Sequence, residues 1–117
     1  MAATIEAFAL VPQRGARKLK PREPLLAVLP FDNLSGDAEM QFFSDGVSDE
    51  ILESVARIPG LKVIGRTSSF QFRGPRKSEA AQALHATHIL DGTVRRAGAR
   101  MRVHAQLADE SGTLVWS

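Results

Sequence analysis

The stretch Leu25-Leu26-Ala27-Val28-Leu29-Pro30-Phe31 decides the fold. Its apolar run is short, continuous and ended by a proline, which is typical of a strand buried on both faces of a sheet. Turn-forming residues occupy positions 32–37, and an amphipathic helix follows them. A buried strand, a polar loop and a helix in this order indicate the start of an α/β domain.

Length and composition are those of one water-soluble domain, because the chain has 117 residues of which 44% are apolar and 24% charged. The sequence has no cysteine, which excludes disulfides and thiolate metal sites. No apolar run reaches the ~20 residues that span a bilayer. We expect a cytoplasmic location, with the periplasm also open to a cysteine-free chain, and we predict no cofactor.

The basic excess of the chain lies before the domain. Residues 1–24 carry five basic side chains, Arg14, Arg17, Lys18, Lys20 and Arg22, against two acidic ones, Glu6 and Glu23. Residues 4–11 could form a short strand that ends a preceding domain. Residues 1–24 are therefore predicted to be a basic, Pro-containing linker or tail, and residues 25–117 the domain itself. The alternative for the linker is a basic arm for an acidic partner or for nucleic acid.

The middle of the chain predicts two helices around a second strand. A helix over residues 42–58 has Ser44 as its N-cap and an inner stripe of Val47, Ile51, Leu52, Val55 and Ile58. A strand over residues 61–65 and a loop over residues 66–75 follow. Ser78 is expected to cap a second helix over residues 79–85.

The last third of the chain predicts antiparallel strands. Residues 88–96 and 100–108 flank a turn at Gly98, and a final strand begins at residue 113 and is cut at Trp116. Alternation in the second strand predicts one buried face, which carries Met101, Val103, Ala105 and Leu107. The expected fold class is α/β, with a mixed, mainly five-stranded sheet, two helices packed on it, and parallel pairing in the first crossovers.

Several separated blocks of sequence resemble one family. They are residues 27–37, Phe43 with Asp45-Gly46, residues 58–70, residues 90–98, Arg102-Val103 with Gln106-Leu107, and residues 112–116. Together they resemble the TolB N-terminal-like domain over residues 26–116, which implies an anticodon-binding-domain-like fold. The resemblance also implies fusion to a class III adenylate or guanylate cyclase domain or a winged-helix domain, and to tetratricopeptide repeats. His85 stands where the family usually has glycine, so we expect either that His85 adopts the left-handed conformation or that the turn differs from the family's turn.

Two sets of residues are candidate interaction sites. The first is a ligand or partner loop after the buried strand, made of Asp32, Asn33, Ser35 and Asp37 together with Arg66 and Ser68. Its alternative is a turn whose side chains bond the backbone, and the spacing does not fit a calcium loop. The second set is a docking face for an acidic partner, made of Arg95, Arg96, Arg100 and Arg102. The alternative for this set is a solvated strand face.

Two weaker patterns have structural explanations that we favour. His88 and His104 could face each other across the hairpin, where a surface pair is more frequent than a metal site. Phe70 and Phe72, near Arg66 and Arg73, could stack on bases, but such phenylalanines more often fix a loop to the core. Neither a metal ion nor a nucleic acid is therefore expected to bind.

The sequence contains no nucleophile elbow, phosphate-binding loop or catalytic carboxylate pair. It predicts a non-catalytic sensory or protein-interaction module of a multidomain bacterial signalling protein, with self-association or neighbouring domains as its contacts. One alternative is the regulatory fragment of a nucleotide cyclase polypeptide, and another is an accessory nucleic-acid binder that uses the basic arm. A small-molecule ligand is left open.

Overall fold

Strand β1 (Leu25–Val28) is central in the sheet, as its continuous apolar run predicts. The computed structural model describes residues 22–117, so the predicted strand at residues 4–11 and most of the predicted linker lie outside the described residues. The sheet has six strands in the order β3-β1-β4-β5-β6, and β2 pairs with β4. The mixed α/β class is confirmed, but the count of five strands and two helices is wrong, because the described part has six strands and three α-helices.

The strand directions follow from the connections. Strand β1 pairs in parallel with β3 (Lys62–Val63) on one side and with β4 (His88–Ala97) on the other. Strand β5 (Arg100–Asp109) runs antiparallel to β4, and β6 (Leu114–Trp116) runs antiparallel to β5. These pairings confirm the predicted mixture of strand directions. Parallel neighbours need long crossover connections, whereas antiparallel neighbours can be joined by tight turns.

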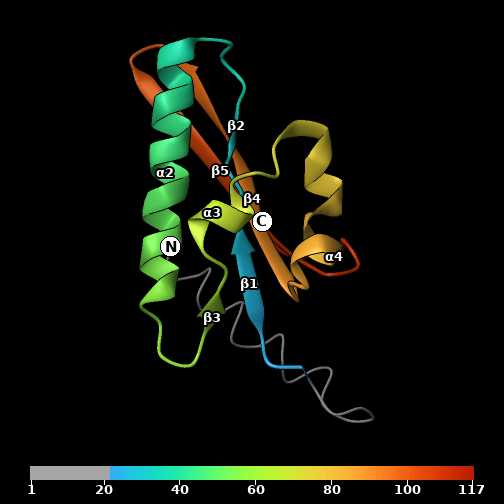
Figure 1. The fold of residues 1–117 in the computed structure, drawn as a ribbon. Helices are drawn as coiled ribbons and strands as arrows, with labels where there is room; N and C mark the ends of the chain where they lie inside the picture. The colour runs from blue at the N-terminus through green and yellow to red at the C-terminus, as the bar shows by residue number, and fades with distance from the viewer. Residues whose placement is uncertain (1–21) are drawn as a thin grey trace.

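The two faces of β1 belong to two different cores. Leu26 and Val28 pack in a cluster with the inner face of α2 (Ala38–Ala56), whereas Ala27 and Leu29 pack with Ala80 of α4 (Ala80–Leu84). Figure 1 shows α2 and α4 on opposite sides of β1. Burial of apolar side chains on both faces is the main source of stability for such a three-layer arrangement.

Helix α2 begins earlier than the apolar periodicity indicates. Its N-cap is Asp37, whose side chain accepts a hydrogen bond from the Glu39 N–H at 3.0 Å, so the prediction of a cap at Ser44 is wrong. Met40 is buried in the additional first turn. Ile51, Leu52 and Val55 face the core as predicted, and Val47 and Ile58 pack against it.

Two serines of α2 hold the end of β1. The Phe31 N–H donates to Ser48 Oγ at 2.8 Å, Ser44 Oγ donates to the Phe31 carbonyl at 2.6 Å, and Ser48 Oγ donates to the Ser44 carbonyl at 2.8 Å. Both serines are fully buried. The helix therefore supplies the hydrogen bonds that a neighbouring strand would give to Phe31.

We expect Ser48→Ala to lower the free energy of unfolding by about 1–3 kcal/mol, because it leaves the buried Phe31 N–H without an acceptor. Ser54→Ala is the matched control on the exposed side of the same helix, and it should change stability by less than about 0.5 kcal/mol. Urea unfolding measures both variants. Equal midpoints for the two variants would contradict the role assigned to Ser48.

The connection between β3 and β4 is helical where a loop was expected. Residues 66–69 form α3 (Arg66–Ser69), and a 3-10 helix, η1 (Gly74–Glu79), precedes α4. Ser78 does not cap α4, because its hydroxyl bonds the Pro75 carbonyl instead. The buried Phe70 and Phe72 fix this connection to the core, as the favoured structural explanation predicts. His85 ends α4 in the left-handed conformation with φ 54°, which is the first of the two alternatives that the sequence left open.

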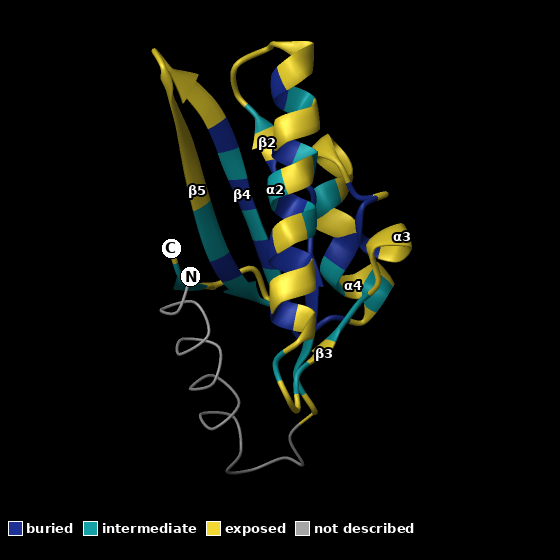
Figure 2. Ribbon diagram, turned by 90° about the vertical axis from the view of Figure 1, so that its left-hand side faces the viewer, coloured by how far each residue is buried: buried dark blue, intermediate teal, exposed yellow. Residues whose placement is uncertain are grey.

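The β4–β5 hairpin extends beyond the core. Gly98, with φ 64°, begins the two-residue turn, as predicted. Met101 and Val103 each have 42% exposure, so the prediction that they are buried is wrong, while Leu107 is buried as expected. Figure 2 shows that both strands become exposed toward the turn. The core cluster under α2 extends along the hairpin only as far as Val94 on β4 and Ala105 on β5. Within residues 22–117, no helix has the length and apolarity that crossing a membrane requires.

Candidate functional site

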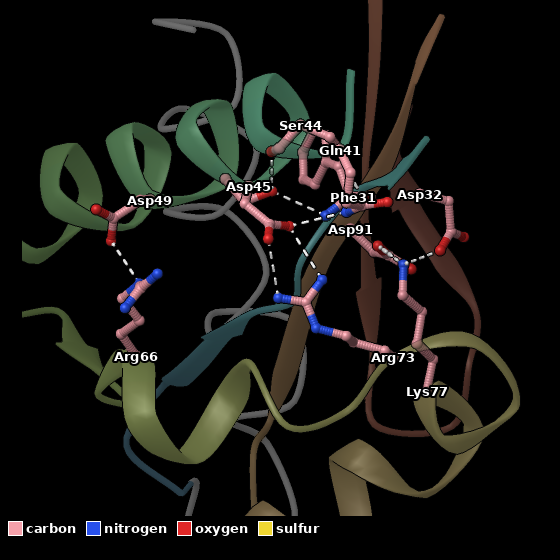
Figure 3. Close-up of polar contacts among 11 residues, drawn as sticks. Phe31, Asp32, Gln41, Ser44, Asp45, Asp49, Arg66, Arg73, Lys77 and Asp91 are labelled. Atoms are coloured by element: carbon pink, nitrogen blue, oxygen red, sulfur yellow. Dashed lines mark hydrogen bonds and ion pairs between the residues drawn. The ribbon is translucent and has the colours of Figure 1, made fainter. Parts of the chain in front are cut away.

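Charged side chains meet where β1 ends, at the edge where open α/β sheets place their ligands. The central one is Lys77 of η1, whose Nζ lies 2.7 Å from Asp91 Oδ1 and 3.2 Å from Asp32 Oδ1. Asp32 begins β2 (Asp32–Asn33), and Asp91 lies within β4. Figure 3 shows the ammonium group between the two carboxylates. The ion pairs therefore join η1, β2 and β4.

Burial makes this charge cluster sensitive to the loss of any member. The Lys77 side chain is only 12% exposed and that of Asp91 only 21%. Burial raises the pKa of the Asp91 carboxyl above its ordinary value, although Lys77 and the Gly92 N–H, which donates to the carboxylate at 2.7 Å, act in the opposite direction. With its ammonium bound to two carboxylates, Lys77 is positioned as a structural cation and not as a free nucleophile.

A second pair of ionic contacts attaches the same connection to α2. Arg73 donates to both oxygens of Asp45, at 3.0 and 3.1 Å, and Arg66 Nε lies 3.3 Å from Asp49 Oδ1 (Figure 3). Asp45 and Asp49 are one helical turn apart, so they present two carboxylates in a row to the connection. Arg66 also lies over the Phe70 ring, 5.0 Å from its centre. These contacts fix the position of α3 on the helix.

The predicted loop residues at positions 33–37 bond the backbone around the start of α2. Asn33 Nδ2 donates to the Asp37 carbonyl at 2.8 Å, and Asn33 Oδ1 accepts from the Ser35 N–H at 2.9 Å. Ser35 Oγ accepts from the Arg96 N–H at 2.7 Å, which links the loop to β4. Asp37 caps the helix, and Asp32 is held by Lys77. The structure thus gives each of these four side chains a local partner.

Arg66 and Ser68 are not joined to that loop. Arg66 bonds Asp49 of α2, and Ser68 is exposed on α3, where its carbonyl accepts from Gln71 Nε2 at 3.0 Å. Among residues 22–117, no hydrogen bond or ion pair connects either residue with positions 32–37. The six residues therefore do not form one compact constellation. Their role in binding a ligand stays a prediction.

The predicted arginine face divides between the two sides of the hairpin. Arg95 and Arg102 are directly opposite each other, and Arg100, two residues along from Arg102, shares their side. Arg96 is on the other side, where its guanidinium lies 3.6 Å from Met40 Sδ. In the part of the chain that the structure describes, no acidic group forms an ion pair with Arg95, Arg100 or Arg102. An open hollow of ≈ 480 Å³ adjoins them, lined by Leu34, Thr93, Arg95, Arg102, Val103 and His104.

The histidines do not form a pair. His88 lies opposite Asp109 and His104 lies opposite Thr93, so the expectation that they could face each other is wrong. His88 is buried, with Nδ1 2.8 Å from Thr87 Oγ1, and burial lowers the pKa of its imidazole despite the nearby charges of Asp109 and Glu110. Over residues 22–117, no three His, Asp or Glu side chains are arranged to hold a metal ion.

Sequence reasoning did not single out Lys77 or Asp91, and it gave Asp45 and Arg73 no role in this site, although all four make its ionic contacts. Only Asp91 could have been noticed in the sequence, because it is an acidic residue within the predicted strand, between Leu90 and Gly92. Lys77 lies in a segment rich in polar residues, where nothing distinguishes a buried lysine from an exposed one. The cations at the end of β1 in this α/β domain are thus bonded to carboxylates of the same chain.

Comparison with known sequences finds a relative for this domain. The chain is 41% identical over 100 residues to a Rhizobium meliloti (strain 1021) protein named "Putative adenylate cyclase 3", and the match covers 83% of this chain. The chain spans only 17% of the length of that relative. No protein-family model matches the sequence.

Solved structures with a similar fold include the C-terminal domain of LpoB and the lipoprotein GNA1162. The C-terminal domain of LpoB from Escherichia coli matches with a TM-score of 0.57 and 11% identity, over 95% of this chain and 91% of that chain. Lipoprotein GNA1162 from Neisseria meningitidis matches with a TM-score of 0.54 and 19% identity, over 81% and 76%. At these identities the likeness shows the fold alone. These matches do not show the anticodon-binding-domain-like fold that the resemblance implied.

Proposed function

We propose that this chain is a non-catalytic sensory or protein-interaction module of a bacterial signalling protein, carried within a nucleotide cyclase polypeptide. The observation that carries the proposal is the 41% identity to a protein named as an adenylate cyclase, of which the chain spans only 17%. Most of the relative therefore lies outside the matched segment, and we place its catalytic domain there. The module would pass information to those domains through contacts.

The ionic contacts at the end of β1 support a non-catalytic role. Lys77 is held by Asp32 and Asp91, Arg73 by Asp45, and Arg66 by Asp49. Cyclisation of a nucleotide needs groups that hold the phosphates and neutralise the charge that develops on them. Cations that are already bonded to carboxylates of their own chain are poorly placed for this task. Arg95, Arg100 and Arg102 of the hairpin lie on an open strand face, which suits a docking surface better.

The finer parts of the proposal come from the sequence blocks. We assign the domain to the TolB N-terminal-like kind, with residues 1–24 as the linker from a preceding cyclase or winged-helix domain, and tetratricopeptide repeats after it. The cytoplasm is the compartment that the proposal requires, because ATP is the substrate of an adenylate cyclase. Contacts with these neighbouring domains, or self-association, would carry the signal.

An assay of nucleotide turnover tests the proposal. The purified chain of 117 residues should form no cyclic AMP from ATP and no cyclic GMP from GTP. In the Rhizobium meliloti relative, replacement of the matched segment by a flexible Gly/Ser linker should leave the KM for ATP unchanged, because the segment supplies no group to the substrate. Cyclisation by the isolated chain, or a raised KM in the relative, would contradict a non-catalytic role.

A further inference from the structure

The outer edge of β5 is open over most of its length. Strand β4 pairs with β5 from Arg100 to Asp109, but β6 covers the opposite edge of β5 only at Leu107 and Ala108. Between Arg100 and Gln106, the described part of the chain places no strand on that edge. An open edge of this kind is a template on which another strand can pair.

The backbone groups along this edge point outward at alternate residues. The carbonyls of Leu90 and Val94 accept from the Leu29 and Leu34 N–H groups, so these two residues of β4 direct their backbone away from β5. In an antiparallel ladder the residue opposite such a position likewise points away from its partner strand. Leu107 lies opposite Leu90 and pairs outward with Trp116, as this rule requires. Val103 lies opposite Val94, so it and its alternate neighbours, Met101 and Ala105, present free N–H and carbonyl groups to the edge.

The side chains along the same edge alternate in chemistry. Arg100, Arg102 and His104 share one face, and Arg95 lies beside Arg102 on β4. Met101, Val103 and Ala105 share the other face, where Ala105 packs against the core and the other two are each 42% exposed. One face of the edge is therefore cationic and the other apolar.

We propose that the β5 edge binds an extended segment of a partner protein in which acidic and apolar residues alternate. The backbone of that segment would pair with Met101, Val103 and Ala105. Its acidic side chains would lie beside Arg100, Arg102 and His104, and its apolar side chains would cover the exposed Met101 and Val103. The inference rests on the proposed function as an interaction module and names the chemistry of the partner.

The charge pattern favours an acidic strand over a second copy of this chain. If two β5 edges paired antiparallel about Val103, Arg102 of each copy would face His104 of the other, and Arg95, Arg100 and Arg102 of both copies would share one face. Like charges that are directly opposite across strands destabilise the pairing. Arg95 and Arg102 already make one such contact. A nucleic acid would satisfy the arginines but would leave the apolar face uncovered.

Peptide binding tests the edge directly. The probe is a fluorescein-labelled peptide in which Glu and Val alternate, and its control has the same composition with all Glu residues in one block. Fluorescence anisotropy should show a Kd at least about tenfold lower for the alternating peptide, since only it matches both faces. Amide exchange should slow on binding at Met101, Val103 and Ala105, whose N–H groups face the edge. Arg102, whose N–H already faces β4, should change less.

Two variants separate backbone pairing from charge. Val103→Pro removes an outward N–H without removing a bond to β4, because proline is tolerated in an edge strand where its nitrogen faces solvent. It should abolish binding, whereas Val103→Ala, which keeps the N–H, should retain binding within about threefold. Arg102→Glu should weaken binding by about tenfold or more. Unchanged urea midpoints verify that each variant is folded.

Several results would overturn the inference. Equal affinity for the blocked peptide, or full binding by Val103→Pro, would show that charge alone attracts the probe. Dimerisation of the chain in sedimentation, abolished by Val103→Pro, would assign the edge to a second copy. Tighter binding of single-stranded DNA than of the peptide would assign the face to nucleic acid. Failure of the peptide to bind would leave the proposed function standing, whereas nucleotide cyclisation by the chain, or a raised KM in the relative, would contradict the proposed function.

Discussion

Gly92→Ala is expected to destabilise the domain by more than about 3 kcal/mol, enough to prevent folding if the parent is marginally stable. A Cβ atom at this position would lie 2.0 Å from the His104 carbonyl oxygen, and 2.6 and 2.9 Å from two carbons of the Phe31 ring. The carbonyl belongs to β5, which cannot move without opening its ladder with β4. The Phe31 ring is buried, and the backbone of Phe31 is held by Ser44 and Ser48. No neighbour can therefore yield to the added methyl group.

Gly46→Ala is the matched control for this prediction. Gly46 is exposed on α2 and has nothing within 4 Å of an added Cβ, so alanine should stabilise the domain by about 0.5–1 kcal/mol through helix propensity. Circular dichroism during urea unfolding measures both variants. A Gly92→Ala protein that unfolds cooperatively near the parental midpoint would show that Phe31 does not pack against Gly92.

Lys77→Met is expected to lower the free energy of unfolding at neutral pH by about 2–4 kcal/mol, because it leaves Asp91 buried without a cation. In this variant the pKa of Asp91 in the folded state should rise further above its unfolded value. A carboxyl with a raised pKa in the folded state stabilises that state at low pH and loses this contribution as the pH rises through the folded pKa. The loss of stability should therefore be smaller near pH 4 than at pH 7.

The double variant Lys77→Met with Asp91→Asn isolates the ion pair. Its neutral amide can still accept from the Gly92 N–H, so the double variant should recover at least half of the stability lost in Lys77→Met. Denaturant unfolding of the two single variants and the double variant at pH 7 completes the cycle. Strictly additive losses would show that Lys77 and Asp91 do not depend on each other.

The elements that follow from the sequence are those with a clear period of their own. The continuous apolar run at residues 25–29 predicts a central strand, and the stripe of Ile51, Leu52 and Val55 predicts the inner face of a helix. The turn at Gly98 predicts the hairpin. In each case the structure that the local residues favour is also the one that the tertiary fold requires, so local and global preferences agree.

The start of α2 could not be predicted because its first turns depart from that period. Phe42 is exposed, although its apolar side chain indicates a buried face of the helix. Ser44 and Ser48 are buried, although their polar side chains indicate an exposed face. Their burial depends on hydrogen bonds with Phe31, which lies 13 residues before Ser44. A partner so distant in sequence leaves no local pattern.

The candidate site shows the same limit more strongly. The sequence placed polar residues correctly at the end of β1, since Asp32 does take part in the cluster. It could not indicate Lys77, because the contact with Asp91 requires η1 to lie beside β4, and the segment was expected to be a loop before a helix. The hairpin arginines are visible as a cluster in the sequence, but their division between two faces depends on register, which composition does not reveal.

The position of β1 between two later strands has a consequence for synthesis on the ribosome. Leu26 pairs with Val63 on one side and with His88 on the other, so the most buried strand of the sheet leaves the ribosome well before either of its neighbours. Until β3 and β4 emerge, its apolar residues have no neighbouring strand, whereas β5 and β6 can each pair with the strand translated just before them. The apolar residues of β1 thus stay exposed on the nascent chain, and the sheet can form around β1 only when most of the domain has been translated.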